Sequence, residues 1–461
     1  MLKGRKLNLA ILALVLAETS AASQRPGGET SRNVHNHNAF SQASANMPLR
    51  QRLDFSVGNS FFRNPWVAAP ASTAARDGLG PLLNTNACQN CHIKDGRGHA
   101  PASLSDNAVS LLVRLDQESK PTNSPAQANV PDPIYGGQIQ DFALPGLEPE
   151  ARVQIHYEPV TRQFADGSSI ELRRPRLQLQ QLAYGPLDPN TRMSARIAPP
   201  MIGLGLLQAI PEERLLQLED PEDSNGDGIS GRVNRVWQLA TQSTVIGRFG
   251  WKAGQPSLLQ QNAAAFNGDM GLTSHLFVSE NCTEQQRICQ DTINGNDAEG
   301  TEVSRHILNQ VTFYTGNLAV PTRRTPNAEN VQKGEVLFSE IGCHQCHTPS
   351  HRTAGDYHQA WLANQSIAPY TDLLLHDMGE ELADHTREFN ATGREWRTPP
   401  LWGIGLTKIV SGHEHYLHDG RARSLEEAIL WHGGEASRSR KAYQQLPGEQ
   451  RQQLLAFVAD L

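Results

Sequence analysis

Charged side chains are scarce in this sequence, and it has no basic tract. Asp, Glu, Lys and Arg make up 19% of the 461 residues and give a net charge of −7. Without a basic tract, the chain lacks the electrostatic footprint of a nucleic-acid-binding protein. After the first 22 residues, no apolar run approaches the ~20 residues that a helix needs to cross a membrane, so we expect no stable membrane span there.

Glycine and proline, in contrast, are plentiful. The chain has 38 Gly and 28 Pro, which predict many loops. Its length is too great for one compact core and predicts two or three domains. The hydrophobic share of 38%, taken together with the glycines, is close to that of globular proteins and argues against a mainly disordered chain.

The first 22 residues have the pattern of a signal peptide. Lys3, Arg5 and Lys6 form a basic start, residues 7–17 are apolar, and small residues follow up to Ala22. This arrangement predicts cleavage after Ala22 and export, with a periplasmic location where disulfides persist. A retained membrane anchor is the alternative, although the apolar run is short for a spanning helix.

Cysteine is rare, and four of the six cysteines fall in two short motifs. Both Cys88–His92 and Cys343–His347 read C-x-x-C-H. This is the attachment signature of c-type haem, in which two thiols bond to the haem vinyl groups and the following histidine binds the iron. We therefore expect two covalently bound haem c groups.

Two other uses of these cysteines are possible. A redox C-x-x-C motif needs no following histidine and normally lies in a βαβ unit, for which the sequence gives no sign. A four-cysteine zinc site would have to join pairs 255 residues apart. Both are weaker interpretations than haem attachment in an exported chain. The remaining pair, Cys282 and Cys289, predicts a local disulfide, with free thiols as the alternative.

The apolar patterning predicts a mainly α fold with two c-type cytochrome domains. An N-terminal haem domain is expected over residues 23–320, with a β-rich insertion at about 108–195, where short alternating runs are broken by Gly, Pro and Asp-Gly. Residues 321–326 form the expected linker. A C-terminal cytochrome c domain follows over 327–461, in which apolar residues recur at helical spacing just before the second motif and at the chain end.

An acidic loop lies between the two haem motifs. Asp223, Asn225 and Asp227 occupy the first, third and fifth positions of a D-x-N-x-D-G calcium loop, and Ile229 offers a backbone carbonyl. Position twelve is Asn234 in place of the usual glutamate. Calcium binding is one hypothesis, and a plain acidic turn is the other, because Asn, Asp and Gly favour turns in any case.

Several longer stretches resemble the bacterial di-haem oxidoreductase family, a family of peroxidases also labelled thiol oxidoreductases. The similarity covers about residues 40–461. More distantly, the sequence is similar to the di-haem cytochrome c peroxidases and to the methylamine-utilisation enzyme that oxidises tryptophans in a partner protein. The stretches that carry the resemblance are Asp77–Pro81, Cys88–Gly98, Pro131–Gly137, Gly203–Leu207, Thr371–Gly379 and Leu417–Ala422.

The resemblance implies a sixth iron ligand for the C-terminal haem. His432 lies on the apolar stripe of an expected helix that starts at Ser424, where distant peroxidases carry a methionine. It is therefore our candidate partner of His347, with Met378, Tyr416 and His418 as competitors and a core or capping role as the alternative. The stretch where peroxidases place a histidine for the N-terminal haem, residues 196–200, has none. We therefore expect an open iron position there, with His99 as a surface residue.

Two further roles follow from the resemblance. Asp269 lies where peroxidases have a catalytic glutamate, so we expect it to move the proton during O–O cleavage; a carboxylate that caps a turn is the alternative. Trp251 matches the tryptophan between the haems of the relatives. Its alternative is ordinary packing, with Trp237 as a rival.

The resemblance thus predicts an enzyme that reduces peroxide at the N-terminal haem, with electrons passed through the C-terminal haem. The expected partners are a small redox protein or cytochrome as electron donor, and peroxide or an oxidisable protein as substrate. A plain electron-transfer cytochrome is the alternative. Thiol oxidation is a third hypothesis and would depend on Cys282 and Cys289 as free thiols.

Overall fold

The structure is a computed structural model that describes residues 24–101, 106, 109–117 and 122–461. The expected signal peptide, residues 1–22, lies outside the described residues. Among the described residues, no helix combines the length and apolar character needed to cross a membrane.

The prediction of a mainly α fold is wrong. Helices account for 29% of the chain and strands for 17%, with only two-stranded sheets among the described residues. The longest helices have 13 residues. The physical reason lies in the abundance of glycine and proline, which end helices early and leave loops to form much of the structure.

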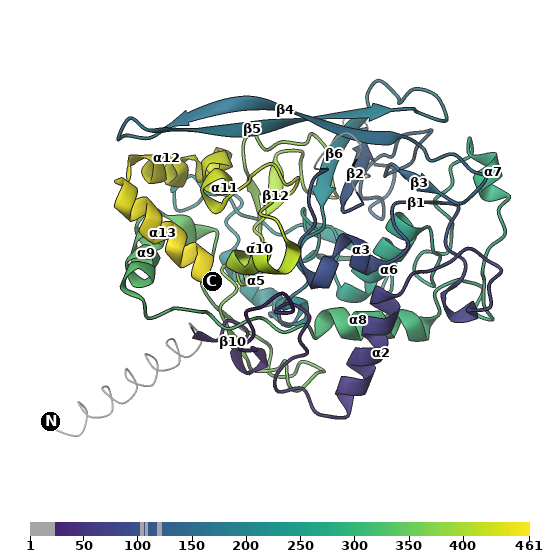
Figure 1. Cartoon of the computed structure of the whole chain (residues 1–461), viewed down its shortest axis with the longest axis horizontal. Helices are drawn as coiled ribbons and strands as arrows, with labels where there is room; N and C mark the ends of the chain where they lie inside the picture. Colours follow the sequence, from purple (N-terminus) through teal and green to yellow (C-terminus); the bar gives the residue numbers. More distant parts are fainter. Residues whose placement is uncertain (1–23, 102–105, 107–108, 118–121) are drawn as a thin grey trace.

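The helices and strands alternate irregularly along the chain (Figure 1). The α-helices are α2 Gln51–Arg63, α3 Cys88–Cys91, α4 Leu204–Gln208, α5 Glu212–Leu218, α6 Leu258–Met270, α7 Arg287–Gln290, α8 Arg305–Gly316, α9 Glu329–Glu340, α10 Thr407–Ser411, α11 Leu425–Trp431, α12 Ser437–Gln445 and α13 Gly448–Asp460. The strands are β1 Leu82–Leu83, β2 Leu111–Asp116, β3 Phe142–Ala143, β4 Arg152–Gln163, β5 Ser169–Gln180, β6 Arg192–Ile197, β7 Arg235–Gln238, β8 Ser243–Ile246, β9 His351–Arg352, β10 Ser366–Ile367, β11 Leu375–Asp377 and β12 Glu395–Arg397.

Strands β4 and β5 form one long antiparallel hairpin. All 12 residues of each strand pair, and the chain reverses at Asp166-Gly167, where Gly167 has φ +84°. The alternating pattern in the sequence had predicted strands here. The hairpin extends across the C-terminal helices α11 and α12 (Figure 1). It is held there by the ion pair between Arg162 and Glu381, 2.6 Å, and by contact between the rings of Phe164 and Tyr443.

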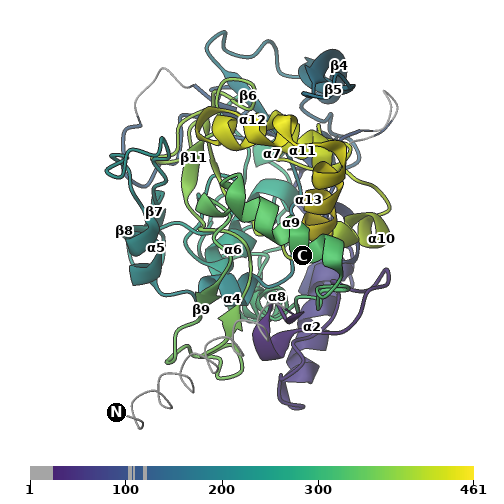
Figure 2. The same cartoon turned by 90° about the vertical axis from the view of Figure 1, so that its left-hand side faces the viewer.

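The helix before the second haem motif forms as its apolar spacing predicts. Figure 2 shows α9 beside α13. The two helices approach closely because Gly334 has no side chain: a Cβ there would collide with the Gln453 carbonyl oxygen. Helix α9 ends just before Gly342, whose φ of +87° suits glycine, and the chain then turns into Cys343.

The buried residues do not separate at the expected linker. One apolar cluster includes Leu111 and Ile197 together with Phe338 and Phe457, and a second joins residues before 260 to residues after 360. The two parts of the chain therefore share packed surfaces. The boundaries 23–320 and 327–461 stay a prediction.

Candidate functional site

The first C-x-x-C-H motif forms a short helix with its histidine at the C-terminal end. Cys88 and Cys91 begin and end α3, and His92 follows it. The Nδ1 atom of His92 donates to the backbone oxygen of Pro199 at 2.8 Å. This bond leaves Nε2 as the nitrogen that can bind a metal. Burial lowers the pKa of His92 to about 4, so the imidazole is neutral, as an iron ligand must be.

A cavity of about 420 Å³ opens beside His92. Its wall combines apolar side chains with a few polar ones, including Asp269. Among the described residues that line it, His92 is the only histidine, and Met201 and Met270 are the only thioethers. Within the described part of the chain, no second imidazole is therefore available in this cavity to bind a metal opposite His92.

Asp269 lies near the end of α6 with its carboxylate turned to polar partners. Its Oδ1 accepts from Gln138 Nε2 at 3.0 Å and lies 4.0 Å from a guanidinium nitrogen of Arg114. Burial raises the pKa of Asp269, which Arg114 and Gln138 partly offset. The alternative role was a carboxylate that caps a turn. The amides of Asn84 and Thr85 do donate to Asp269, but they donate to its backbone oxygen and not to its carboxylate.

The second motif lines a cavity of about 180 Å³ in the C-terminal part of the chain. Here Cys343 begins a 3-10 helix, and the Nδ1 atom of His347 donates to the backbone oxygen of Tyr370 at 3.0 Å. Burial lowers the pKa of His347 to about 4. This histidine is therefore neutral and oriented in the same way as His92, with Nε2 free.

His432 faces His347 across this cavity. It follows α11, whose N-terminus is capped as predicted by Ser424 Oγ accepting from the Glu427 amide. The ring centroids of His347 and His432 are 6.5 Å apart. Two imidazoles bound on opposite sides of one metal at about 2.0 Å each would have centroids roughly 6.3 Å apart. The Nδ1 atom of His432 donates to the Ala428 oxygen at 2.7 Å, which again leaves Nε2 free.

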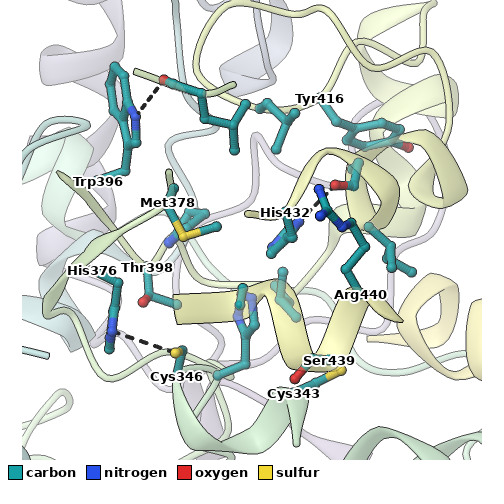
Figure 3. Close-up of a pocket in the computed structure, with 18 of the residues that line it drawn as sticks. Cys343, Cys346, His376, Met378, Trp396, Thr398, Tyr416, His432, Ser439 and Arg440 are labelled. Carbon is teal, nitrogen blue, oxygen red and sulfur yellow. Dashed lines mark hydrogen bonds between the residues drawn. The ribbon is translucent and has the colours of Figure 1, made fainter. Parts of the chain in front are cut away.

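The three competitors of His432 line the same cavity, as Figure 3 shows for Met378 and Tyr416. Among the described residues, His347 has a ring contact with His432 but none with these three competitors. The structure thus brings together the histidine pair expected from the resemblance.

The sequence analysis missed a charged cluster beside the second motif. His376 is buried between two carboxylates, with Nε2 2.8 Å from Asp372 and Nδ1 2.7 Å from Glu435. The charge of Asp372 raises the pKa of His376 against the effect of burial. Nδ1 also lies 3.6 Å from the sulfur of Cys346 (Figure 3). Asp372 and His376 are close in sequence, but Cys346 and Glu435 come from distant parts of the chain, so no local pattern could have indicated the whole cluster.

Trp251 lies between the two cavities and lines both. Its Nε1 donates to the Ile197 oxygen at 2.9 Å, which fixes the orientation of the indole. Trp237, its rival in the sequence, lines the N-terminal cavity and is absent from the wall of the C-terminal one. The indole of Trp251 thus has the position between the two motifs that the resemblance implies.

Arg97 also lines both cavities, and the sequence analysis did not single it out. Its guanidinium carbon lies 5.7 Å from the ring centroid of Trp251 and 5.8 Å from that of Tyr416. Burial lowers the pKa of Arg97 to about 10, which still leaves it charged at neutral pH. The available signal was an arginine between two glycines, five residues after the first motif.

Comparison with known proteins now places the chain. The family described as "Di-haem oxidoreductase, putative peroxidase" matches residues 21–461. The chain belongs to this family. No curated protein matches it. A structure of hydrazine synthase from Kuenenia stuttgartiensis, pressurised with 20 bar xenon, aligns with 94% of this chain and 96% of its own at 11% identity. Its TM-score of 0.31 carries no argument about fold or function.

The residues of this di-haem oxidoreductase fit two haem groups. Each cavity combines a C-x-x-C-H motif with a neutral imidazole whose Nε2 is free, and the cavity walls are largely apolar. Cys88, Cys91 and His92 would hold one group. Cys343, Cys346 and His347 would hold the other, with His432 on its opposite side.

The acidic loop of this oxidoreductase uses its oxygen atoms within the loop. Asp223, Asn225 and Asp227 accept bonds from the amides of Gly228, Asp227 and Ile229 respectively. Asp227 also accepts from Gln345 Nε2 at 3.1 Å, which places the loop against the second haem motif. These bonds suit an acidic turn, and the calcium hypothesis stays a prediction.

The local disulfide is confirmed. Cys282 and Cys289 are bonded, with their Cα atoms 5.8 Å apart. The thiol-oxidation hypothesis required these two residues as free thiols, and the described structure provides none at this place.

Proposed function

We propose that this oxidoreductase is an exported di-haem c-type peroxidase. When bound, the N-terminal haem supplies the iron at which peroxide takes up two electrons and two protons to give water, and the C-terminal haem stores and delivers electrons. The observation that carries the proposal is the difference between the cavities: a second histidine faces His347, and among the described residues none accompanies His92 in its cavity wall.

In this proposal the four motif cysteines hold the haems and the histidines set their reactivity. The Pro199 and Tyr370 carbonyls keep the Nε2 atoms of His92 and His347 unprotonated. His432, which faces His347, would be a second ligand of the C-terminal group and would exclude others. The cavity beside His92 would leave room for peroxide.

Asp269 is the proposed proton carrier. Its carboxylate lines the N-terminal cavity, and the raised pKa from burial brings it nearer to the working pH than an exposed aspartate would be. The carboxylate takes the first proton from the bound peroxide and returns it to the leaving oxygen. Gln138 orients Oδ1 through its side-chain amide, and Arg114 favours the charged form.

Trp251 is the proposed link between the two haems. An indole that lines both cavities shortens the gap that an electron must cross. Its bond to the Ile197 oxygen keeps the ring in place, and the nearby charge of Arg97 makes a lasting positive charge on the ring unfavourable. The tryptophan therefore passes electrons between the haems and does not hold an oxidised state of its own.

The remaining parts of the proposal concern partners and metals. A small redox protein or cytochrome would donate electrons to the C-terminal haem. Calcium in the loop of Asp223, Asn225 and Asp227 would stabilise the segment next to Gln345. Removing calcium with a chelator from holoprotein should then lower the melting temperature, and an unchanged melting temperature would contradict this part.

The test uses purified holoprotein, a reduced small cytochrome c and hydrogen peroxide. We expect peroxide-dependent oxidation of the cytochrome with a stoichiometry of two electrons per peroxide. Cyanide should perturb the absorption of one haem and leave the other unchanged. An absence of both effects would contradict the peroxidase proposal.

A plain electron-transfer cytochrome is the second candidate. The observation that favours it is the presence of Met201 and Met270 in the wall of the N-terminal cavity, because a methionine sulfur is a common axial ligand in electron-transfer haems. In that case cyanide would bind neither haem. Oxidation of a partner protein is the other alternative, and it would consume peroxide without a cytochrome donor.

A further inference from the structure

Three histidines form a cluster outside both haem cavities. His99 follows the first haem motif, whereas His413 and His415 lie more than 300 residues later. The ring centroids of His99 and His413 are 5.2 Å apart, those of His413 and His415 are also 5.2 Å apart, and those of His99 and His415 are 6.1 Å apart. His99, expected as a surface residue, is half-buried. Neither cavity includes these three side chains.

In the described part of the chain, two of the three rings have a nitrogen without a hydrogen bond, and the third has a nitrogen that only accepts one. The Nδ1 atom of His99 donates to the Ala100 oxygen at 2.8 Å, which leaves Nε2. The Nε2 atom of His413 donates to the Arg97 oxygen at 3.0 Å, and its Nδ1 accepts from the His415 amide at 3.3 Å, a bond that a metal ion at Nδ1 would replace. The Nδ1 atom of His415 is buried without a hydrogen-bond partner. In metal sites, a ligating histidine commonly donates its other nitrogen to a carbonyl in this way.

The spacing of the rings also suits one shared metal ion. Three imidazoles bound to one ion at about 2.1 Å, with tetrahedral angles, would have centroids roughly 5.3 Å apart. In the described residues the three nitrogens do not yet all lie within 4.8 Å of one another. Binding therefore requires the rings to rotate.

The charges around the cluster favour neutral rings. Burial lowers the pKa of His413 and of His415 to about 4, and Arg97 and Arg173 add to this effect. The carboxylate of Glu414 is held by Lys408 at 3.2 Å. At neutral pH the imidazoles of His413 and His415 are therefore unprotonated at a nitrogen that a metal could use.

We propose that His99, His413 and His415 form a binding site for a divalent transition metal of the zinc and copper class. Imidazole nitrogen is a preferred ligand of these ions, and three histidines with one open position are a common set. A bound ion would join the segment after the first haem motif to residues 413–415. It would also lie next to Arg97, whose carbonyl His413 contacts and whose side chain lies against Trp251.

Zn²⁺ titration of untagged holoprotein, followed by calorimetry, tests the proposal. We expect one Zn²⁺ ion to bind per chain. Losing an outer-shell partner typically costs about 10–100-fold in metal affinity, so His99→Ala and His415→Ala should each weaken binding by at least about that factor. His306→Ala is the matched control, because His306 is an exposed histidine on α8 far from the cluster in sequence, and it should leave the affinity unchanged.

Haem absorption and circular dichroism show whether each variant folds. A second measurement, on the wild-type chain, tests the proposal even if a variant does not fold. Zn²⁺ should protect His99, His413 and His415, but not His306, from diethylpyrocarbonate, as read by mass spectrometry. The proposal is overturned if folded His99→Ala and His415→Ala bind Zn²⁺ as tightly as the wild type, or if Zn²⁺ gives no protection to the cluster.

Discussion

The imidazole of His418 stacks on the indole of Trp396, with ring centroids 3.7 Å apart and an angle of 11° between the planes. A charged group also lies over this indole, because Lys252 Nζ is 4.2 Å from the ring centroid of Trp396. His418 is thus committed to packing, although it lines the cavity of the second haem motif. His432 carries no such constraint and faces His347.

We therefore predict that His432→Ala removes the second imidazole from the C-terminal haem. One of the two haems should lose its bis-imidazole low-spin signal in electron paramagnetic resonance, and its iron should gain the ability to bind cyanide. His418→Ala is the matched control and should keep the low-spin signal. A wild-type spectrum without any bis-imidazole species would contradict the assignment.

The role of Asp269 predicts a large loss of peroxidase activity in Asp269→Asn. General acid–base catalysis typically contributes about 100- to 10,000-fold, so turnover with peroxide should fall by about that factor while both haems remain bound. Asp291→Asn, on an exposed loop, should retain wild-type turnover. Equal turnover in the two variants would exclude Asp269 as the proton carrier.

The environment of Asp269 also predicts the acid side of the pH profile. The carboxylate must be ionised to accept the proton, and burial raises its pKa above the ordinary 3.8. Turnover should therefore fall on acidification at a higher pH than an exposed aspartate would give. Stopped-flow rates measured across the acid range on wild type and Asp269→Glu would show this fall in turnover. The pH at which turnover falls should shift in the variant.

Trp251 predicts a change in the communication between the haems. Trp251→Phe should keep both haems but slow the transfer of electrons from the C-terminal to the N-terminal one, because the indole lines both cavities. Trp237→Phe is the matched control, since that indole lines the N-terminal cavity alone. Stopped-flow spectroscopy of the reduced protein mixed with peroxide follows both haems. Equal transfer rates in the two variants would make Trp251 a packing residue only.

Glu150 predicts a loss of stability as the pH rises. Burial raises its pKa from the ordinary 4.5 to about 8, so the folded chain holds a proton that the unfolded chain releases within this window. The contribution of Glu150 to the free energy of unfolding is fully present below about pH 4.5. It falls as the pH rises towards 8, by at most about 1.4 kcal/mol per pH unit. Glu150→Gln should reduce the drop in melting temperature between pH 5 and 8. Glu148→Gln, which alters an exposed side chain, should not.

Much of the candidate site was predictable from local sequence patterns. The C-x-x-C-H spacing gave Cys88, His92 and their counterparts, and the apolar spacing before Gly342 gave α9. The carbonyls that orient the histidines, those of Pro199 and Tyr370, have no side-chain signature and come from distant loops. Their positions depend on tertiary contacts that no short window of sequence encodes.

The fold class was the larger error. Residues at helical spacing around the motifs indicated cytochrome-like helices, and these exist as α9, α11 and α13. Between them, however, loops and the three-residue strands β11 and β12 contribute to the wall of the second cavity. Arg97 was missed for a related reason, because its importance comes from lying between two cavities that are distant in sequence.

The hairpin of β4 and β5 has a consequence for how the chain matures. It is synthesised long before α11, α12 and α13, yet its tip is anchored on them: Asp166 pairs with Arg451 at 2.9 Å, and the Ala165 amide donates to the Gln444 oxygen. A two-stranded ribbon is at best marginally stable alone. We therefore infer that the ribbon becomes stable only after the last 40 residues have folded against its tip.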